Sequence, residues 1–299
     1  MGRESVLFPV TWKQSQWPIA SQVRGEMNGW SLPRDNQPLP GTDRFAGDDD
    51  VIDFETGSSI PQHFLYWRFP TKGAFQVAPK GYPSALRVRP SRANLSGPIN
   101  STDKALTGKL GISFIGRKQS HTFFFYSVDL LFNPHNSDQE AGVTVFLTQS
   151  NYVSLGLVKV PGNKNGYELR LRTMSTSSTS IRTRLVPQTW NRAQNLRLEI
   201  STLNDTHYVF SAHPKDCAED RMVLGYADTR VVSGDSGPFT GALVGVYATC
   251  NGAGKHDHVF CPPGGDAFFS RWRYTGIGQK IDFSQIEYSG ADDTRTTEH

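Results

Sequence analysis

The stretch HTFFFYSVDLLF (121–132) decides the fold class of this chain. Aromatic and aliphatic residues crowd it, turn-forming residues stand on both sides, and it carries no 3.6-residue period. Short runs of this kind, rich in aromatic and β-branched residues and bounded by turn formers, are typical of β-strands. We therefore predict a strand at 121–132.

Nine further stretches share this pattern, and no segment of 11 or more residues shows a helical period. Ten strands over about 240 residues predict an all-β, two-sheet jelly roll in one domain, not a smaller immunoglobulin-type domain. No repeat of 20–50 residues suggests a propeller or solenoid. The Ser- and Thr-rich segment 173–180 is predicted to be a hairpin loop. The nine stretches are 110–119, 141–149, 152–160, 166–174, 180–187, 195–202, 207–214, 242–250 and 267–276.

Size and composition agree with a sheet protein. The chain has 299 residues, with 18 Phe, 10 Tyr and 6 Trp against 4 Met. A chain of this length removes roughly 75% of its unfolded surface from water, enough for a large core. Its net charge of +3 is spread along the sequence, so nucleic acid is not an expected partner. No apolar run approaches the roughly 20 residues of a membrane span, and we expect no membrane contact.

The composition changes along the chain, and we expect three parts. Residues 1–45 contain an apolar strand at 5–12 and then a Pro-, Trp- and Gly-rich arm without periodicity. Residues 46–290 carry the strands, and 291–299 form a polar tail. The strand at 5–12 is an unpaired apolar edge, which either docks on the sandwich through Trp12, Trp17 and Trp30 or causes self-association.

The cellular compartment stays open. No basic and apolar leader stands at the start of the sequence, whereas sequons at Asn94, Asn100 and Asn204 fit a secretory route. Cys250 and Cys261 flank a polar loop and are close enough in sequence to form a disulfide, although two reduced buried thiols are an equal alternative. Cys217 has no evident partner.

Several motifs resemble reactive sites but fit simpler roles. GDSGP (234–238) resembles the nucleophile stretch of trypsin-type proteases, yet its residues are ordinary turn formers. His256 and His258 lack the ligand spacing of a zinc site, and the acidic run 47–55 lacks a calcium-loop pattern, so we expect no metal and no cofactor. Asp129 and Glu140 could become a carboxylate pair only through folding.

The middle of the chain holds the residues best suited to a sugar. Arg117 and Gln119 share one side of their strand, as do Thr144 and Phe146 on another. On the inside of a curved sheet, such groups would hydrogen-bond hydroxyl pairs while an aromatic ring stacks on the sugar. The alternative is an ordinary solvent-facing strand. The candidate substrate-binding residues are Arg117, Gln119, Glu140, Thr144, Phe146 and Tyr247.

Seven segments together resemble fungal members of glycoside hydrolase family 43, of the β-xylosidase and α-L-arabinofuranosidase type. In order, they resemble the last strand of the catalytic propeller, a linker and the C-terminal concanavalin A-like β-sandwich. The resemblance implies a concanavalin A-like jelly-roll sandwich with an extended N-terminal arm. The segments are 1–12, 17–33, 113–134, 140–149, 154–158, 239–252 and 269–281.

The resemblance also implies what to expect of activity. In the family, the acid and base carboxylates belong to a five-bladed propeller upstream of the GRE motif, and Met1 would correspond to an internal position. We therefore expect no xylosidase activity from this chain in isolation, a missing propeller as a partner, and Arg3 as the position matching a substrate-contacting arginine. The family suggests secretion. The expected function is an accessory module binding xylan- or arabinan-type oligosaccharides. The alternative is a repurposed jelly-roll enzyme or small-molecule-binding protein, for example in a fungal biosynthetic pathway.

Overall fold

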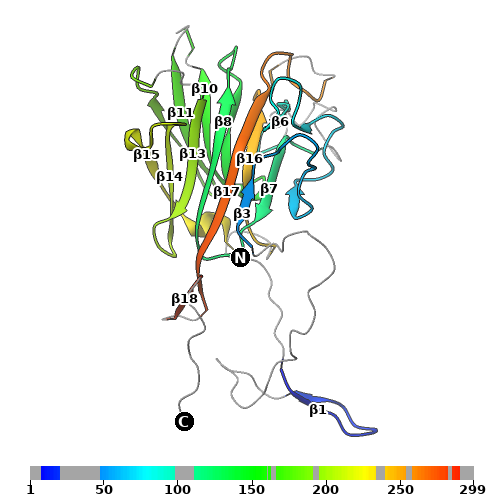
Figure 1. Ribbon diagram of the computed structural model, residues 1–299. Helices are drawn as coiled ribbons and strands as arrows, with labels where there is room; N and C mark the ends of the chain where they lie inside the picture. Colours follow the sequence, from blue (N-terminus) through cyan, green and yellow to red (C-terminus); the bar gives the residue numbers. More distant parts are fainter. Residues whose placement is uncertain are drawn as a thin grey trace.

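The computed structural model is a sandwich of two antiparallel β-sheets (Figure 1). Two short 3-10 turns, η1 (Ala218–Asp220) and η2 (Thr229–Val232), are the helical elements of the part of the chain that is described. No helix there has the length and apolarity to cross a membrane. The structure describes residues 8–20, 48–97, 111–159, 161–162, 166–190, 195–233, 240–253, 258–281 and 285–289.

The seven-stranded sheet has the order β12-β11-β10-β9-β16-β7-β4. Its central strands are buried on both faces, so they read as continuous apolar runs in the sequence. Its strands are β4 (Phe64–Tyr66), β7 (Phe114–Lys118), β9 (Glu140–Thr148), β10 (Asn151–Lys159), β11 (Tyr167–Met174), β12 (Thr179–Leu185) and β16 (Leu243–Thr249).

The nine-stranded sheet has the order β15-β14-β13-β8-β17-β6-β5, with β3 and β18 also paired to β17. In Figure 1, β17 (orange) runs beside β8 (green) along this sheet. Its strands are β3 (Asp50–Ile52), β5 (Phe75–Val77), β6 (Leu86–Val88), β8 (Phe123–Phe132), β13 (Asn195–Thr202), β14 (His207–Pro214), β15 (Met222–Asp228), β17 (Ala267–Lys280) and β18 (Ile286–Tyr288).

The main core lies between the two sheets, and a smaller one covers the far side of the seven-stranded sheet. Alternate residues of β8, from Phe124 to Phe132, are fully buried in the main core. In the smaller core, Ala93, Leu95 and Ile112 pack over Phe146 and Tyr247. Both faces of the seven-stranded sheet are therefore covered near its centre.

The ten strands predicted from the sequence are all present, and the hairpin predicted at 173–180 connects β11 to β12. The acidic run at 47–55 contains β3, in which Asp50 is buried. The fold class is therefore confirmed. The charged strand entry expected in this acidic run is thus present as β3, whereas the strand β15 and the short strands β4 to β6 were not predicted.

At the N-terminal end, β1 (Val10–Thr11) and β2 (Ile19–Ala20) pair as a hairpin. The side chains of Trp12 and Trp17 are 73% and 90% exposed, so neither docks on the sandwich. Trp30 and the predicted domain boundary near residue 45 lie outside the described residues, as do the GDSGP stretch and His256.

Candidate functional site

The structure separates the sequence-predicted site residues into two groups on opposite faces of the seven-stranded sheet. Arg117 and Gln119 point between the sheets, toward β14 and β17. Glu140, Thr144 and Phe146 lie on the far face, with Tyr247. These six side chains are therefore not brought together into one site, and Arg3 lies outside the described residues.

Arg117 is fully buried and its donors are used inside the protein. Its Nη1 lies 3.1 Å from the Asp50 carboxylate and 2.7 Å from the Asp48 carbonyl oxygen. Its guanidinium stacks on the Tyr274 ring at 3.8 Å from the centroid. Gln119 accepts a hydrogen bond of 2.8 Å from the Tyr208 hydroxyl. The solvent-facing alternative is wrong for Arg117, since this network fixes the inter-sheet end of β7.

Asp50 is the acceptor at the centre of this network. Its carboxylate also accepts a hydrogen bond from the Trp272 indole at 3.0 Å and lies 3.0 Å from His63 Nε2. A buried carboxylate needs several donors to compensate for its lost hydration. Asp50 therefore ties β3 to β17 and to β7.

Glu140 is the centre of the second network and is fully buried. It accepts hydrogen bonds from the Tyr247 hydroxyl at 2.5 Å, from Arg170 at 3.1 Å and from Arg172 at 3.5 Å. Burial, and after it the charge of Glu140, raises the pKa of Tyr247 well above its ordinary value. The Tyr247 hydroxyl therefore stays protonated and donates to the carboxylate.

The side chains of Thr144 and Phe146 are buried and inaccessible to a ligand in this conformation. Thr144 Oγ1 donates to the Val153 carbonyl at 2.8 Å, and the Phe146 ring is enclosed by Phe114 and Tyr152. A substrate-binding role for the six candidates stays a prediction, and it would require the covering segments to move away.

The carboxylates Asp129 and Glu140 do not form a pair. Asp129 lies on the outer face of the nine-stranded sheet, because its β8 neighbours Val128 and Leu130 face the main core. Glu140 lies on the outer face of the other sheet. The two carboxylates therefore point to opposite sides of the sandwich.

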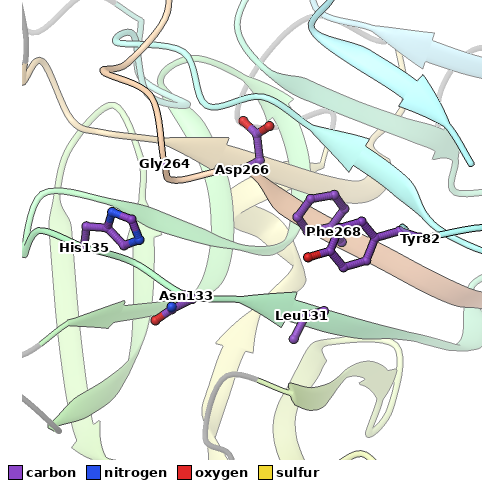
Figure 2. Close-up of a pocket in the computed structure, with 7 residues that line it drawn as sticks. All are labelled: Tyr82, Leu131, Asn133, His135, Gly264, Asp266 and Phe268. Carbon is purple, nitrogen blue, oxygen red and sulfur yellow. The ribbon is translucent and has the colours of Figure 1, made fainter. Parts of the chain in front are cut away.

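An open hollow of about 440 Å³ lies at one end of the nine-stranded sheet (Figure 2). Tyr82 and Phe268 stack at its side, with ring centroids 3.8 Å apart and an interplanar angle of 20°. The side chains of Tyr82 and Leu131 are 37% and 38% exposed. The hollow is lined by Tyr82, Leu131, Asn133, His135, Gly264, Asp266 and Phe268.

Polar groups stand around this aromatic pair. Figure 2 shows His135 at the opposite end from Tyr82, with Asn133 and Asp266 between them. Asn133 accepts a hydrogen bond of 3.3 Å from the Tyr167 hydroxyl, and the Asp266 carboxylate lies 3.8 Å from Arg87. An apolar ring surface beside amide, imidazole and carboxylate groups can stack on a sugar and hydrogen-bond its hydroxyls.

Two local features shape the hollow. Gly264 has a φ of +96°, and a Cβ there would stand 2.8 Å from His135 Cε1, so only glycine allows the imidazole to lie so close. Cys250 and Cys261 form a disulfide just before this turn. The disulfide therefore restrains the segment that carries Gly264 and Asp266.

Sequence reasoning missed the hollow because its residues come from three separate segments. The sequence feature that could have located the hollow is Leu131, an apolar residue that follows Ser127 and Asp129 on the outer face of β8, just before Asn133. Among the described residues, no group of three or more His, Cys, Asp or Glu side chains is placed to hold a metal ion.

Comparison with known proteins identifies the family. Residues 52–261 match the family model described as the Beta xylosidase C-terminal Concanavalin A-like domain. The chain belongs to this family. The match covers most of the sandwich, including Tyr82, Leu131 and the disulfide, and it confirms the expected concanavalin A-like architecture.

Relatives of known name agree with this assignment. The chain is 26% identical over 255 residues to the non-reducing end alpha-L-arabinofuranosidase BoGH43B of Bacteroides ovatus. The aligned region covers 84% of this chain and 42% of that protein. The solved Bacteroides ovatus xyloglucan PUL GH43B has a TM-score of 0.68 at 23% identity, covering 92% of this chain and 48% of that one. BlXynB of Bacillus licheniformis, a GH43 protein, has a TM-score of 0.64 at 20% identity, with 92% and 47% covered. The chain thus spans less than half the length of these relatives.

Proposed function

We propose that this chain is the accessory β-sandwich of a glycosidase that acts on xylan- or arabinan-type glycans, and that it binds oligosaccharide without catalysing hydrolysis itself. Its membership of the β-xylosidase C-terminal family supports this, as does its similarity to a protein named as an arabinofuranosidase. In the proposed arrangement, a separate catalytic domain cleaves the glycan, and the sandwich contacts the same polymer.

The proposal that the chain does not itself catalyse hydrolysis rests on how its buried carboxylates are paired. An inverting glycosidase needs a protonated acid and an ionised base about 6.5–9.5 Å apart. In the described residues, the four buried carboxylates are each held by one or more arginines. They are Asp50 with Arg117, Asp129 with Arg197, Glu140 with Arg170 and Arg172, and Glu199 with Arg221. Each of these carboxylates is thus engaged in an ion pair within the sandwich and is not presented to a substrate as an acid or base.

The hollow beside Tyr82 and Phe268 is the proposed contact with glycan. Its size lies within the range of small-ligand sites, which is roughly 300–1,000 Å³. The exposed aromatic surface would pack on the C–H face of a pyranose or furanose ring. Asn133, His135 and Asp266 would then hydrogen-bond the ring hydroxyls. The family model is named for β-xylosidase and the Bacteroides ovatus relative is named as an arabinofuranosidase, so xylose and arabinose oligomers are the first ligands to test.

The test is calorimetric titration of the whole chain with xylo- and arabino-oligosaccharides. We expect binding, and a loss of about tenfold in affinity for Tyr82→Ala, or ~1.4 kcal/mol, because the stacking surface is removed. Tyr226→Ala is the matched control, since Tyr226 is also exposed on the nine-stranded sheet but lies far along it on β15. Absence of binding to any pentose oligomer, or equal losses in the two variants, would contradict the proposal.

The non-catalytic part is tested separately. Purified chain should release no 4-nitrophenol from aryl xylosides or arabinofuranosides above a matched blank. Release that survives repeated purification would favour the alternative of a repurposed jelly-roll enzyme.

A further inference from the structure

The outer face of β8 continues from the hollow onto a positively charged stretch. Along this face, Leu131 is followed by Asp129 and then Ser127. On the neighbouring strand, Phe268 pairs with Leu131 and Ser270 pairs with Asp129. The aromatic hollow and the Asp129 position are therefore adjacent rows of the same surface.

Asp129 is shared by two arginines. Arg197 approaches its Oδ1 through both Nε and Nη2, each at 2.7 Å. Arg271 Nη1 lies 3.6 Å from the other oxygen, Oδ2, which is longer than a hydrogen bond. Oδ2 is buried and accepts no hydrogen bond within the structure described. Two guanidinium groups thus surround one carboxylate and leave a local excess of one positive charge.

The neighbouring charges do not remove this excess. Glu199, the next carboxylate on this face, is held by Arg221 at 2.6 Å and lies 3.4 Å from His213. Asp266, at the hollow, lies 3.8 Å from Arg87. Each of these carboxylates is thus already balanced by an arginine of its own.

The backbone at Arg271 is held in an unusual conformation. Its φ is +50°, and it lies in a β-bulge between Ser270 and Arg273 of β17. A non-glycine residue in this region costs free energy, and β-bulges of this kind re-aim side chains next to functional sites. The Arg271 side chain is 47% exposed, and its guanidinium makes no hydrogen bond among the described residues. Its donors are thus available to a ligand.

We propose that the hollow and Arg271 form one subsite for an acidic oligosaccharide, in which a neutral sugar ring stacks at Tyr82 and Phe268 and a uronate carboxylate pairs with Arg271. Phe268 and Arg271 are three residues apart, a span of at most roughly 10 Å because the bulge shortens the strand, and two linked sugar rings can cover it. A planar guanidinium recognises a carboxylate through two parallel hydrogen bonds. The inference rests on the glycan-binding function proposed above and adds that the bound glycan is negatively charged.

The experiment compares xylotriose with xylotriose carrying one glucuronic acid substituent, by calorimetric titration of the full chain. At roughly 0.02 M salt, we expect the acidic sugar to bind about five- to tenfold more tightly, and the preference to shrink at about 0.5 M salt because the pair is exposed. Arg271→Asn should abolish the preference while retaining binding of xylotriose. Asparagine tolerates a positive φ, so the variant should keep the fold, which its thermal unfolding would verify.

The matched control is Arg184→Asn, which removes an exposed arginine from β12 of the other sheet and should leave the preference unchanged. Equal binding of the two sugars by the unaltered chain overturns the inference but leaves the proposed glycan-binding function standing. Binding of neither sugar overturns both. A preference that persists in Arg271→Asn overturns the role of this arginine.

Discussion

Replacing Glu140 with glutamine should destabilise the sandwich strongly, because one fully buried carboxylate holds two arginines. Removing one partner of a buried ion pair costs about 3–5 kcal/mol. Arg170 keeps a second partner, Glu168 at 2.9 Å, and the new amide oxygen can still accept from Tyr247. Arg172 loses the only carboxylate that pairs with it among the described residues. We therefore expect the lower end of the range, about 3 kcal/mol for Glu140→Gln.

The electrostatic setting of Arg172 supports this estimate. Burial lowers the pKa of Arg172, but Glu140, with Tyr247 and Tyr152, outweighs burial and holds the pKa above its ordinary value. Arginine does not lose its proton in proteins, so without Glu140 the charge remains buried and uncompensated. The cost of the unpaired charge therefore appears as a loss of folding stability, because Arg172 cannot remove it by deprotonation.

The assay is urea unfolding of Glu140→Gln beside Glu168→Gln, whose carboxylate also pairs with Arg170 but is partly exposed. The control should lose less than about 1 kcal/mol, as exposed pairs do. The midpoint of Glu140→Gln should fall with an unchanged m-value. Because a buried pair is little screened, the loss should persist in about 1 M salt. A loss below about 1 kcal/mol, or one equal to that of Glu168→Gln, would refute the reasoning.

Three further outcomes are expected. Replacing Cys250 and Cys261 with alanine should lower the free energy of unfolding by about 3 kcal/mol, measured by urea unfolding, since the disulfide closes a loop with a sequence separation of 11. Burial, and after it the charge of Arg117, lowers the pKa of His121 from its ordinary 6.5. The contribution of the neutral His121 side chain to folding stability is therefore fully present above pH 6.5, and it is lost as the pH falls through the pKa of the folded state. His121→Gln should therefore weaken the acid dependence of the urea midpoint below pH 6.5, and an unchanged dependence would contradict this. A hydrogen bond with Glu219 and then burial raise the pKa of Cys217 from 9.0 to about 11, so its alkylation rate should still be rising at pH 10, and a plateau near pH 9 would contradict this.

The fold could be predicted because its central strands carry a strong local signal. Residues 121–132 and 141–149 are long aromatic and aliphatic runs bounded by turn formers, and each became a strand. The segment 50–88 was harder, since its strands have three residues each and are separated by Gly and Pro turns. Such short strands form only because the sheet edge pairs with them, and pairing partners are not visible in local sequence.

The site could not be predicted in the same way. Arg117 and Gln119 were correctly placed on one side of a strand, but alternation does not tell which side a second layer covers. Ala93, Leu95 and Ile112 cover the far face of the seven-stranded sheet, so Phe146 and Tyr247 became core residues. The Tyr82 and Phe268 stack joins residues far apart in the chain. The pairing of β17 with β6, which places Phe268 opposite Arg87, brings the β5–β6 connection and its Tyr82 to this ring.

The exposed β1–β2 hairpin carries two tryptophans that can serve as intrinsic fluorescence probes. Trp12 and Trp17 stand in solvent, whereas Trp190 and Trp272 are buried in the sandwich. A collisional quencher such as acrylamide should therefore reduce the emission of the hairpin indoles first and leave a blue-shifted component from the core. Any domain that covers the hairpin would protect the first component alone. Association with a catalytic partner could thus be followed by fluorescence without attaching a label.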